Sequence, residues 1–219
     1  MLPITKKLIR YNFSSRSRQK ILYVVIHDTG NPRAGANAEA HFRYFNGGNR
    51  GSSAHYFVDD RTIVQTVADE NASWHCGDGR GRYGITNENS IGVEICLNAD
   101  GEFDQAVVNT LDLTQHLMER HSIPIDRVVR HFDASRTICP RTMSANDWAR
   151  WWDFKRTLAE MTDEELKQAV LVFEQNGLID SPEYWLENAR RGKTINGEYA
   201  GILIKRVAAF ISEAAGENM

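Results

Sequence analysis

Short runs of apolar residues bounded by polar ones predict the strands of this chain. The predicted strands are residues 21–26, 55–58, 62–67, 91–97 and 125–130. The first run, ILYVVI, is uninterrupted and mostly β-branched or aromatic, which is typical of a strand buried on both faces. Asp59-Asp60-Arg61 separates the second run from the third, so these two strands are expected to form a hairpin.

Helical spacing of apolar positions marks the segments between these strands. In residues 103–121 the apolar side chains recur every three to four residues, which predicts an amphipathic helix. Residues 36–46 have helical composition and stop at Gly47-Gly48, a common helix terminator. Residues 146–158 carry three tryptophans and Phe154, which we expect to pack on a core more readily than to form a stacking surface. Residues 1–158 therefore predict an α/β domain with a mixed central sheet flanked by helices.

The remaining residues, 159–219, show helical patterns only. Thr162 and Glu165 form a capping-box pattern that predicts the start of a helix running to Asn176-Gly177. Ser181-Pro182 predicts the start of a second helix, and residues 199–215 predict a third, amphipathic one. From residue 160 onward there are 11 acidic and six basic side chains. The change in pattern and charge predicts a small all-helical C-terminal domain.

Composition narrows the class of protein. The chain has 219 residues, 42% hydrophobic and 25% charged, with a net charge of −3. This excludes a disordered or fibrous chain and gives no reason to expect nucleic acid as a partner. The longest apolar run, 21–26, is far shorter than the about 20 residues that cross a bilayer, so membrane insertion is not expected. Because the first 20 residues lack an apolar signal block, we expect synthesis in the cytoplasm.

Two histidines and one cysteine stand where chemistry is expected. His27 and His131 each follow a predicted strand, and functional side chains of α/β folds gather at strand ends. Cys139 follows eight residues after His131. Imidazole and thiolate are preferred Zn²⁺ ligands, and a catalytic zinc takes three of them plus water. A purely structural zinc needs a fourth ligand, for which Cys76, Cys96 or His75 is available.

Glu94 is the other residue that invites a functional interpretation. A carboxylate within an apolar strand costs several kcal/mol to bury unless it is paired or linked to a metal. Alternatively, Glu94 lies on the solvated face of an edge strand. Beside a zinc-bound water, a glutamate can act as the general base. Among the other histidines we expect His41, His116 and His121 to be structural, whereas His55 is ambiguous.

Taken in order, five stretches of the sequence resemble zinc N-acetylmuramoyl-L-alanine amidases, the superfamily of phage endolysins and peptidoglycan recognition proteins. The stretches are VVIHDT (24–29), SSAHY (52–56), SWHCGDG (73–79), NSIGVEI (89–95) and RHFDASRTICP (130–140). The resemblance implies a mixed sheet flanked by helices. It also implies zinc ligands at His27, His131 and Cys139, a catalytic carboxylate at Glu94, and cleavage of peptidoglycan between N-acetylmuramic acid and L-alanine.

The sequence departs from the family pattern at two positions. Many relatives have a lysine two residues before the ligand cysteine, where this chain has Thr137, and some have a tyrosine where it has Ala54. We therefore place the chemistry on zinc and Glu94, with Thr137 as a hydrogen-bond donor. Trp74 and His75 are candidates for substrate contact, although loop packing explains them equally well.

Two other functions remain open at this stage, as does the role of the C-terminal domain. The chain is either a zinc amidase, a non-catalytic peptidoglycan-binding module, or a hydrolase with Cys76 as nucleophile beside His75. In the helical domain, Trp185, Ile202 and Phe210 are candidates for a glycan site or a homodimer contact. A wall-cutting enzyme without an export signal is typical of a phage lysis enzyme, which acts on the cell wall after release.

Overall fold

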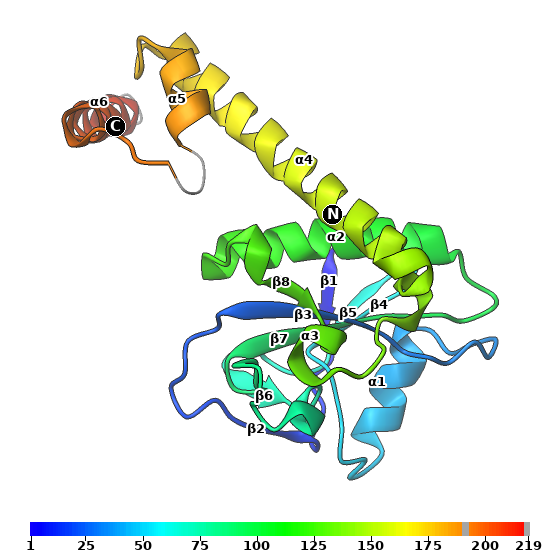
Figure 1. Cartoon of the computed structure of the whole chain (residues 1–219). Helices are drawn as coiled ribbons and strands as arrows, with labels where there is room; N and C mark the ends of the chain where they lie inside the picture. Colours follow the sequence, from blue (N-terminus) through cyan, green and yellow to red (C-terminus); the bar gives the residue numbers. More distant parts are fainter. Residues whose placement is uncertain (190–192, 217–219) are drawn as a thin grey trace. The chain divides into compact units, whose positions relative to one another are not determined.

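The computed structural model describes residues 1–189 and 193–216 of the chain (Figure 1). The chain divides into two compact units, Met1–Leu158 and Ala159–Met219. The helices are α1 (Ala38–Asn46), α2 (Phe103–His121), α3 (His131–Ser135), α4 (Ala145–Gln175), α5 (Pro182–Asn188) and α6 (Gly197–Gly216). Within the described residues, no helix is both long and apolar enough to span a membrane.

A six-stranded mixed sheet forms the centre of the first unit. Its strands, in spatial order, are β1 (Ile4–Lys6), β5 (Ile63–Gln65), β4 (Tyr56–Val58), β7 (Ser90–Ile95), β3 (Tyr23–Asp28) and β8 (Val128–Arg130). Only the β4–β5 pair is antiparallel. The fold class expected from the sequence is therefore confirmed, including the predicted hairpin.

The two faces of the sheet are covered by different helices. Figure 1 shows α2 on one side of the sheet and α1 on the other. Phe57 of β4 packs against Ala38 of α1, and Val25 of β3 packs against Ala134 of α3. Because side chains alternate along a strand, residues in register with Phe57 and Val25 share the face that α1 and α3 cover. Trp151 and Phe154 of α4 are buried, as predicted, whereas Trp152, also expected to pack on the core, is exposed.

Three predictions about the first unit need correction. Residues 125–127 form a 3₁₀ turn, so the last strand is only 128–130. The stretch 71–89 is absent from the predicted strands, but Asn71–Ser73 forms strand β6, paired with β2 (Phe13–Ser15) in a small antiparallel sheet. Strands β1 and β2 were not expected, because short polar segments become strands only through partners distant in the sequence.

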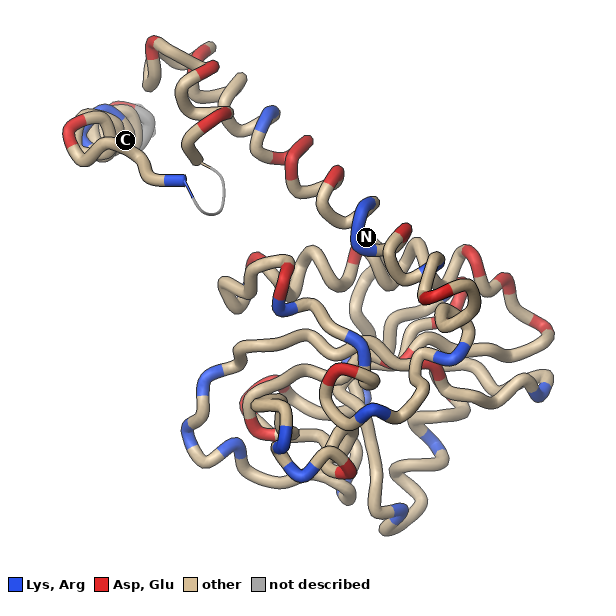
Figure 2. The backbone as a smooth tube through the Cα atoms, viewed as in Figure 1, with Lys and Arg blue, Asp and Glu red and all other residues tan. Residues whose placement is uncertain are grey.

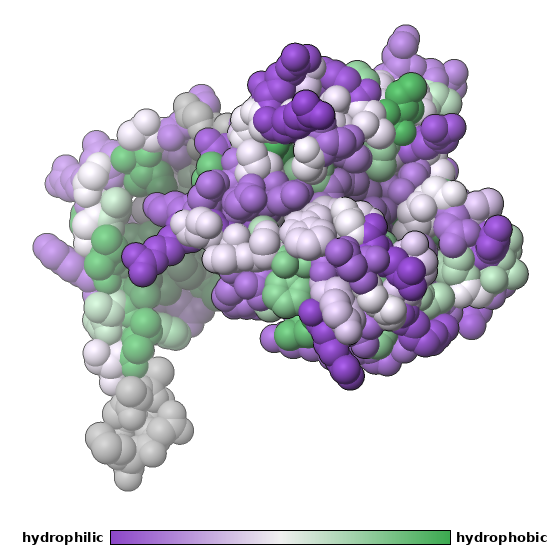
Figure 3. Space-filling view, turned by 90° about the horizontal axis from the view of Figure 1, so that it is seen from below, coloured by the Kyte–Doolittle hydropathy of each residue, from purple (hydrophilic) through white to green (hydrophobic). Residues whose placement is uncertain are grey.

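In the second unit, no new helix starts at Thr162. The helix α4 runs without a break through 162–165, because no glycine or proline interrupts 145–175, and a capping box acts only where the chain leaves the helical conformation. Figure 2 shows acidic positions recurring along this part of α4. The helix α6 exposes apolar side chains, which gather as a green surface in Figure 3. They include Ile202, Ile204, Phe210 and Ile211.

Candidate metal centre and active site

His27 and Glu94 lie side by side at the ends of the two central strands. The Cα atoms of His27 on β3 and Glu94 on β7 are register partners in the parallel pairing. Both side chains therefore project from the face that carries α1 and α3. Strand β7 lies between β4 and β3, so the interpretation of Glu94 as a residue on a solvated edge strand is wrong.

The fold brings His131 and Cys139 to His27. His131 is the first residue of α3, directly after β8, and one ligand atom from each of the three residues lies within 4.8 Å of the others. Cys139 Sγ is 3.7 Å from His27 Nδ1, and the two imidazole ring centres are 4.6 Å apart. The donors predicted from the sequence therefore converge in a single group.

Hydrogen bonds to β3 and α3 fix the segment that carries Cys139. The Asp28 carboxylate accepts hydrogen bonds from the backbone N–H of Thr142 (2.7 Å) and from its hydroxyl (2.8 Å). The carbonyl of Cys139 accepts from the N–H of Phe132 (3.0 Å). The cysteine is thus held from both sides beside the end of the strand that bears His27.

The charge state of the group suits a cation. Burial and the neighbouring His131 lower the pKa of His27 well below its usual value, so the imidazole is neutral and keeps a lone pair. Burial and Asp28 raise the pKa of Glu94 to about 8, and its Oε2 is buried without a hydrogen-bond partner among the described residues. The neutral imidazole of His27, a thiol and an unpartnered carboxylate fit a divalent cation such as Zn²⁺.

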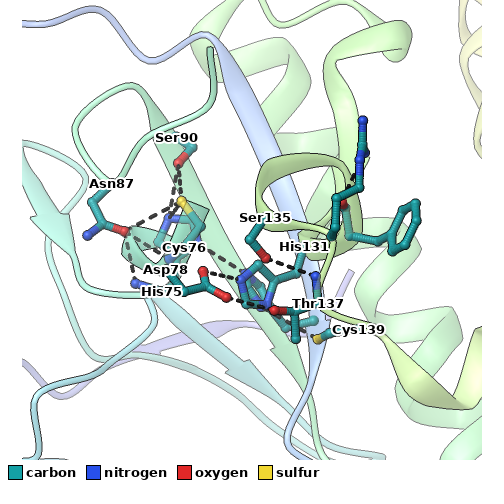
Figure 4. Close-up of polar contacts among 12 residues, drawn as sticks. His75, Cys76, Asp78, Asn87, Ser90, His131, Ser135, Thr137 and Cys139 are labelled. Atoms are coloured by element: carbon teal, nitrogen blue, oxygen red, sulfur yellow. Dashed lines mark hydrogen bonds and ion pairs between the residues drawn. The ribbon is translucent and has the colours of Figure 1, made fainter. Parts of the chain in front are cut away.

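Residues of the loop after β6 contact the donor group, and Figure 4 shows Asp78 of this loop beside His131 and Thr137. His75 Nδ1 is 3.0 Å from His27 Nε2, and Asp78 Oδ1 is 2.8 Å from His131 Nε2. The hydroxyl of Thr137 donates to Asp78 Oδ2 at 2.7 Å. Sequence reasoning missed Asp78; the signal available was a carboxylate between two glycines, directly after His75 and Cys76.

The hydrogen bonds of Trp74 go to Ser14 and Ser53, which are not members of the donor group. The indole N–H of Trp74 donates to Ser14 Oγ (3.2 Å), and its backbone N–H donates to Ser53 Oγ (2.9 Å). These contacts tie the loop to strand β2 and to the chain before β4. Substrate contact by Trp74 or His75 stays a prediction, whereas their role in packing the loop is visible.

The alternative sites proposed for the other cysteines find no support in the geometry. Cys76 and Cys96 are both buried and lie outside the donor group. Cys76 Sγ is 3.9 Å from His75 Nε2, and burial raises the pKa of its thiol to about 12. A nucleophilic cysteine needs access and a substantial thiolate fraction, and Cys76 has neither.

The remaining histidines have structural surroundings. The His55 ring, ambiguous from sequence, is fully buried, accepts a hydrogen bond from the Gly92 N–H at 3.0 Å and lies 2.7 Å from the guanidinium of Arg16. The His41 ring stacks on Phe57, and His121 Nε2 is 3.0 Å from Asp69 Oδ2. These contacts hold the sheet and its flanking helices together.

Comparisons with known proteins identify the family of this chain. The family model described as N-acetylmuramoyl-L-alanine amidase matches residues 17–142. The N-acetylmuramoyl-L-alanine amidase CwlH of Bacillus subtilis is 40% identical over 121 residues, which cover 55% of this chain and 48% of CwlH. The amidase XlyA of the same organism is 42% identical over 122 residues, covering 56% of this chain and 40% of XlyA. The chain thus spans about half the length of these curated relatives.

Solved structures also resemble this chain. A mutant endolysin from Bacillus subtilis superposes with a TM-score of 0.65 at 38% identity, covering 72% of this chain and 99% of that one. The family model spans more than half of the chain and includes His27, Glu94, His131 and Cys139. This chain therefore belongs to the N-acetylmuramoyl-L-alanine amidase family.

Proposed function

We propose that the chain is a zinc-dependent peptidoglycan hydrolase of the endolysin type, which cleaves the amide between N-acetylmuramic acid and L-alanine. The observation that carries this proposal is the convergence of His27, His131 and Cys139 at the strand ends, with Glu94 in register beside His27. Membership of the amidase family supports the reaction, and similarity to an endolysin structure supports the bacterial cell wall as the place of action.

His27, His131 and Cys139 would hold the zinc ion. When bound, zinc supplies Lewis acidity, which polarises an amide carbonyl and makes a coordinated water more acidic. The donor set matches catalytic zinc sites, which have three protein ligands and leave one position open. Burial raises the pKa of the Cys139 thiol, so we expect it to give up its proton only when a cation is present.

Glu94 is the residue placed to move protons. Without a cation, burial and Asp28 raise the pKa of its carboxyl group to about 8; a cation held by the three donors favours the ionised form. A general base works best when its pKa lies near the working pH. We propose that Glu94 accepts a proton from the attacking water and delivers it to the departing amine of L-alanine.

Thr137 has a smaller part in this proposal than the sequence suggested. Its hydroxyl hydrogen already points to Asp78 Oδ2, so it cannot also be donated to a developing oxyanion while that bond persists. A non-catalytic binding module remains the alternative function, and complete retention of the donor group together with Glu94 favours the enzyme.

The experiment that tests the proposed function compares Glu94→Gln with the parent chain. Because the amide cannot accept the proton, we expect Glu94→Gln to keep zinc but to lose roughly 100-fold or more in kcat. Glu70→Gln, which changes an exposed glutamate outside the site, is the matched control and should keep the parent rate. The assay follows new amino groups released from purified cell walls and identifies L-alanine as the new N-terminal residue.

Three results would contradict the proposal. A zinc-loaded Glu94→Gln protein that digests walls at the parent rate would exclude Glu94 as the base. Activity of the parent chain that is insensitive to removal of metal by a chelator, with no gain when zinc is added back, would exclude the zinc mechanism. Release of a different N-terminal residue would show that the chain cuts a bond other than the one proposed.

The second unit remains without an assigned role. Trp185 and Ile202 line a pocket of this unit together with Tyr184, Tyr199 and Arg206, and Phe210 is partly exposed on α6. Binding to wall glycans and formation of a homodimer through these side chains stay predictions.

A further inference from the structure

Residues of the loop 75–79 contact both histidines of the donor group. In each histidine the contact is made by Nε2. His27 offers Nδ1 toward Cys139 Sγ, whereas its Nε2 is 3.0 Å from His75 Nδ1. His131 uses Nε2 toward Asp78 Oδ1 at 2.8 Å, which leaves its Nδ1 free of this bond. One short segment therefore supplies an outer partner to each imidazole. Figure 4 shows the Asp78 carboxylate beside the His131 ring.

A chain of hydrogen bonds fixes the proton on His27. The hydroxyl of Ser90 donates its hydrogen to the carbonyl of Thr86 (2.5 Å), so toward His75 Nε2 (3.0 Å) it acts as acceptor. His75 then carries its proton on Nε2 and accepts through Nδ1. His27 must donate from Nε2, which leaves its Nδ1 lone pair facing Cys139. The chain from Thr86 to His27 thus selects the tautomer that binds a metal through Nδ1.

Asp78 does the same for His131. An ionised carboxylate only accepts hydrogen bonds, so His131 donates from Nε2 and keeps its lone pair on Nδ1. The second carboxylate oxygen accepts from the Thr137 hydroxyl, two residues before Cys139. Asp78 therefore links the segment that carries one donor to the ring of another.

The loop itself is held by close backbone approaches. A Cβ on Gly79 would lie 2.0 Å from the carbonyl oxygen of Ala134 in α3, and a Cβ on Gly92 would lie 2.5 Å from His75 Cγ. The side-chain oxygen of Asn87 accepts from the N–H groups of His75 (3.1 Å) and Cys76 (2.9 Å). These contacts fix the loop against both α3 and β7.

We propose that His75 and Asp78 are positioning residues of the metal centre: each fixes the tautomer and ring orientation of one zinc-binding histidine. The inference rests on the proposed function. In this inference His75 orients a metal-binding histidine and does not contact substrate. Asp78 receives a role that the sequence did not suggest. Outer partners of this kind typically change metal affinity by roughly 10- to 100-fold when removed.

The test measures zinc affinity of the full chain by competition with a chromophoric chelator, together with the visible absorption of the cobalt-substituted protein. We expect His75→Ala and Asp78→Ala each to weaken zinc binding by roughly 10- to 100-fold and to alter the cobalt spectrum. At saturating zinc, kcat should fall while KM stays close to the parent value, because neither residue touches substrate.

Conservative variants and a control separate positioning from a general loss of structure. Asp78→Asn and His75→Gln keep an acceptor oxygen for the histidine N–H, so they should recover most of the affinity. Glu70→Ala, which changes an exposed residue just before β6, should match the parent. If the alanine variants do not fold, Asp78→Asn and His75→Gln provide the test. A smaller loss of zinc affinity with a shifted cobalt spectrum would then support the positioning role.

The outcomes distinguish this inference from the proposed function. If the parent binds zinc but all four variants bind it with parent affinity and an unchanged cobalt spectrum, the positioning role is wrong and the metal site stands. If the parent itself binds no zinc while digesting cell walls, the proposed function fails first, and the positioning role fails with it.

Discussion

The contact between Gly92 and His75 yields a prediction whose size can be worked from the structure. An added Cβ at position 92 would lie 2.5 Å from His75 Cγ and 2.8 Å from Nδ1. The strand cannot retreat easily, because the N–H and carbonyl of Gly92 are both bonded to His55, each at 3.0 Å. The ring of His75 must therefore move by about 1 Å to reach normal van der Waals distance.

We expect Gly92→Ala to destabilise the protein by about 3–5 kcal/mol. Overpacking of a filled site costs about 1–3 kcal/mol, and the displaced ring loses its bonds to His27 and Ser90, worth about 1 kcal/mol each in net terms. At about 2–4 °C per kcal/mol for a chain of this size, Tm should fall by about 6–20 °C. Thermal unfolding followed by circular dichroism with chelator present measures this change without the contribution of metal binding.

A control and a double variant test the reasoning behind this number. An added Cβ on Gly201, inside α6, meets no atom within 4 Å, so Gly201→Ala should leave Tm unchanged or raise it slightly. In the double variant Gly92→Ala/His75→Ala the clash disappears, so its loss of stability should be smaller than the sum of the two single losses. Parent stability of Gly92→Ala, or strict additivity in the double variant, would refute the steric argument.

Two further predictions concern buried titratable groups. Burial alone would raise the pKa of Asp69, but hydrogen bonds from His121 and Tyr56 lower it to about 2. Because this pKa is depressed in the folded state, the ionised carboxylate stabilises the fold by about 2 kcal/mol above pH 4. This stabilisation is lost as the pH falls toward 2. Asp69→Asn should remove this part of the pH dependence in urea unfolding at pH 5 and pH 2.5, and an unchanged pH dependence would contradict the assignment. Since burial raises the pKa of Cys76 to about 12, Cys76 should resist iodoacetamide in the native chain at pH 8 and react once urea unfolds it; peptide mass analysis measures both states, and rapid native labelling would contradict the burial argument.

Local pattern was sufficient for the long and strongly periodic elements. The helix predicted at 103–121 has those bounds in the structure, and the apolar runs at 21–26 and 91–97 became the two central strands. In these segments propensity and burial agree, because most apolar positions face the core, with Val108 as an exposed exception. Where the signal was short and polar, as at Phe13–Ser15 and Asn71–Ser73, strand formation depended on a partner nearly 60 residues away.

The candidate site, like the fold, could be predicted from the sequence only in part. The amino-acid sequence by itself determined the donors His27, His131 and Cys139 and the carboxylate Glu94, because residue chemistry and family motifs are local properties of the chain. Only the tertiary structure decided that Glu94 lies in a central strand and that the loop bearing His75 and Asp78 reaches the outer nitrogens of both histidines. Those relations depend on strand order and on the close backbone approach at Gly92 and Gly79, which join segments far apart in sequence and leave no periodic signal within any one of them.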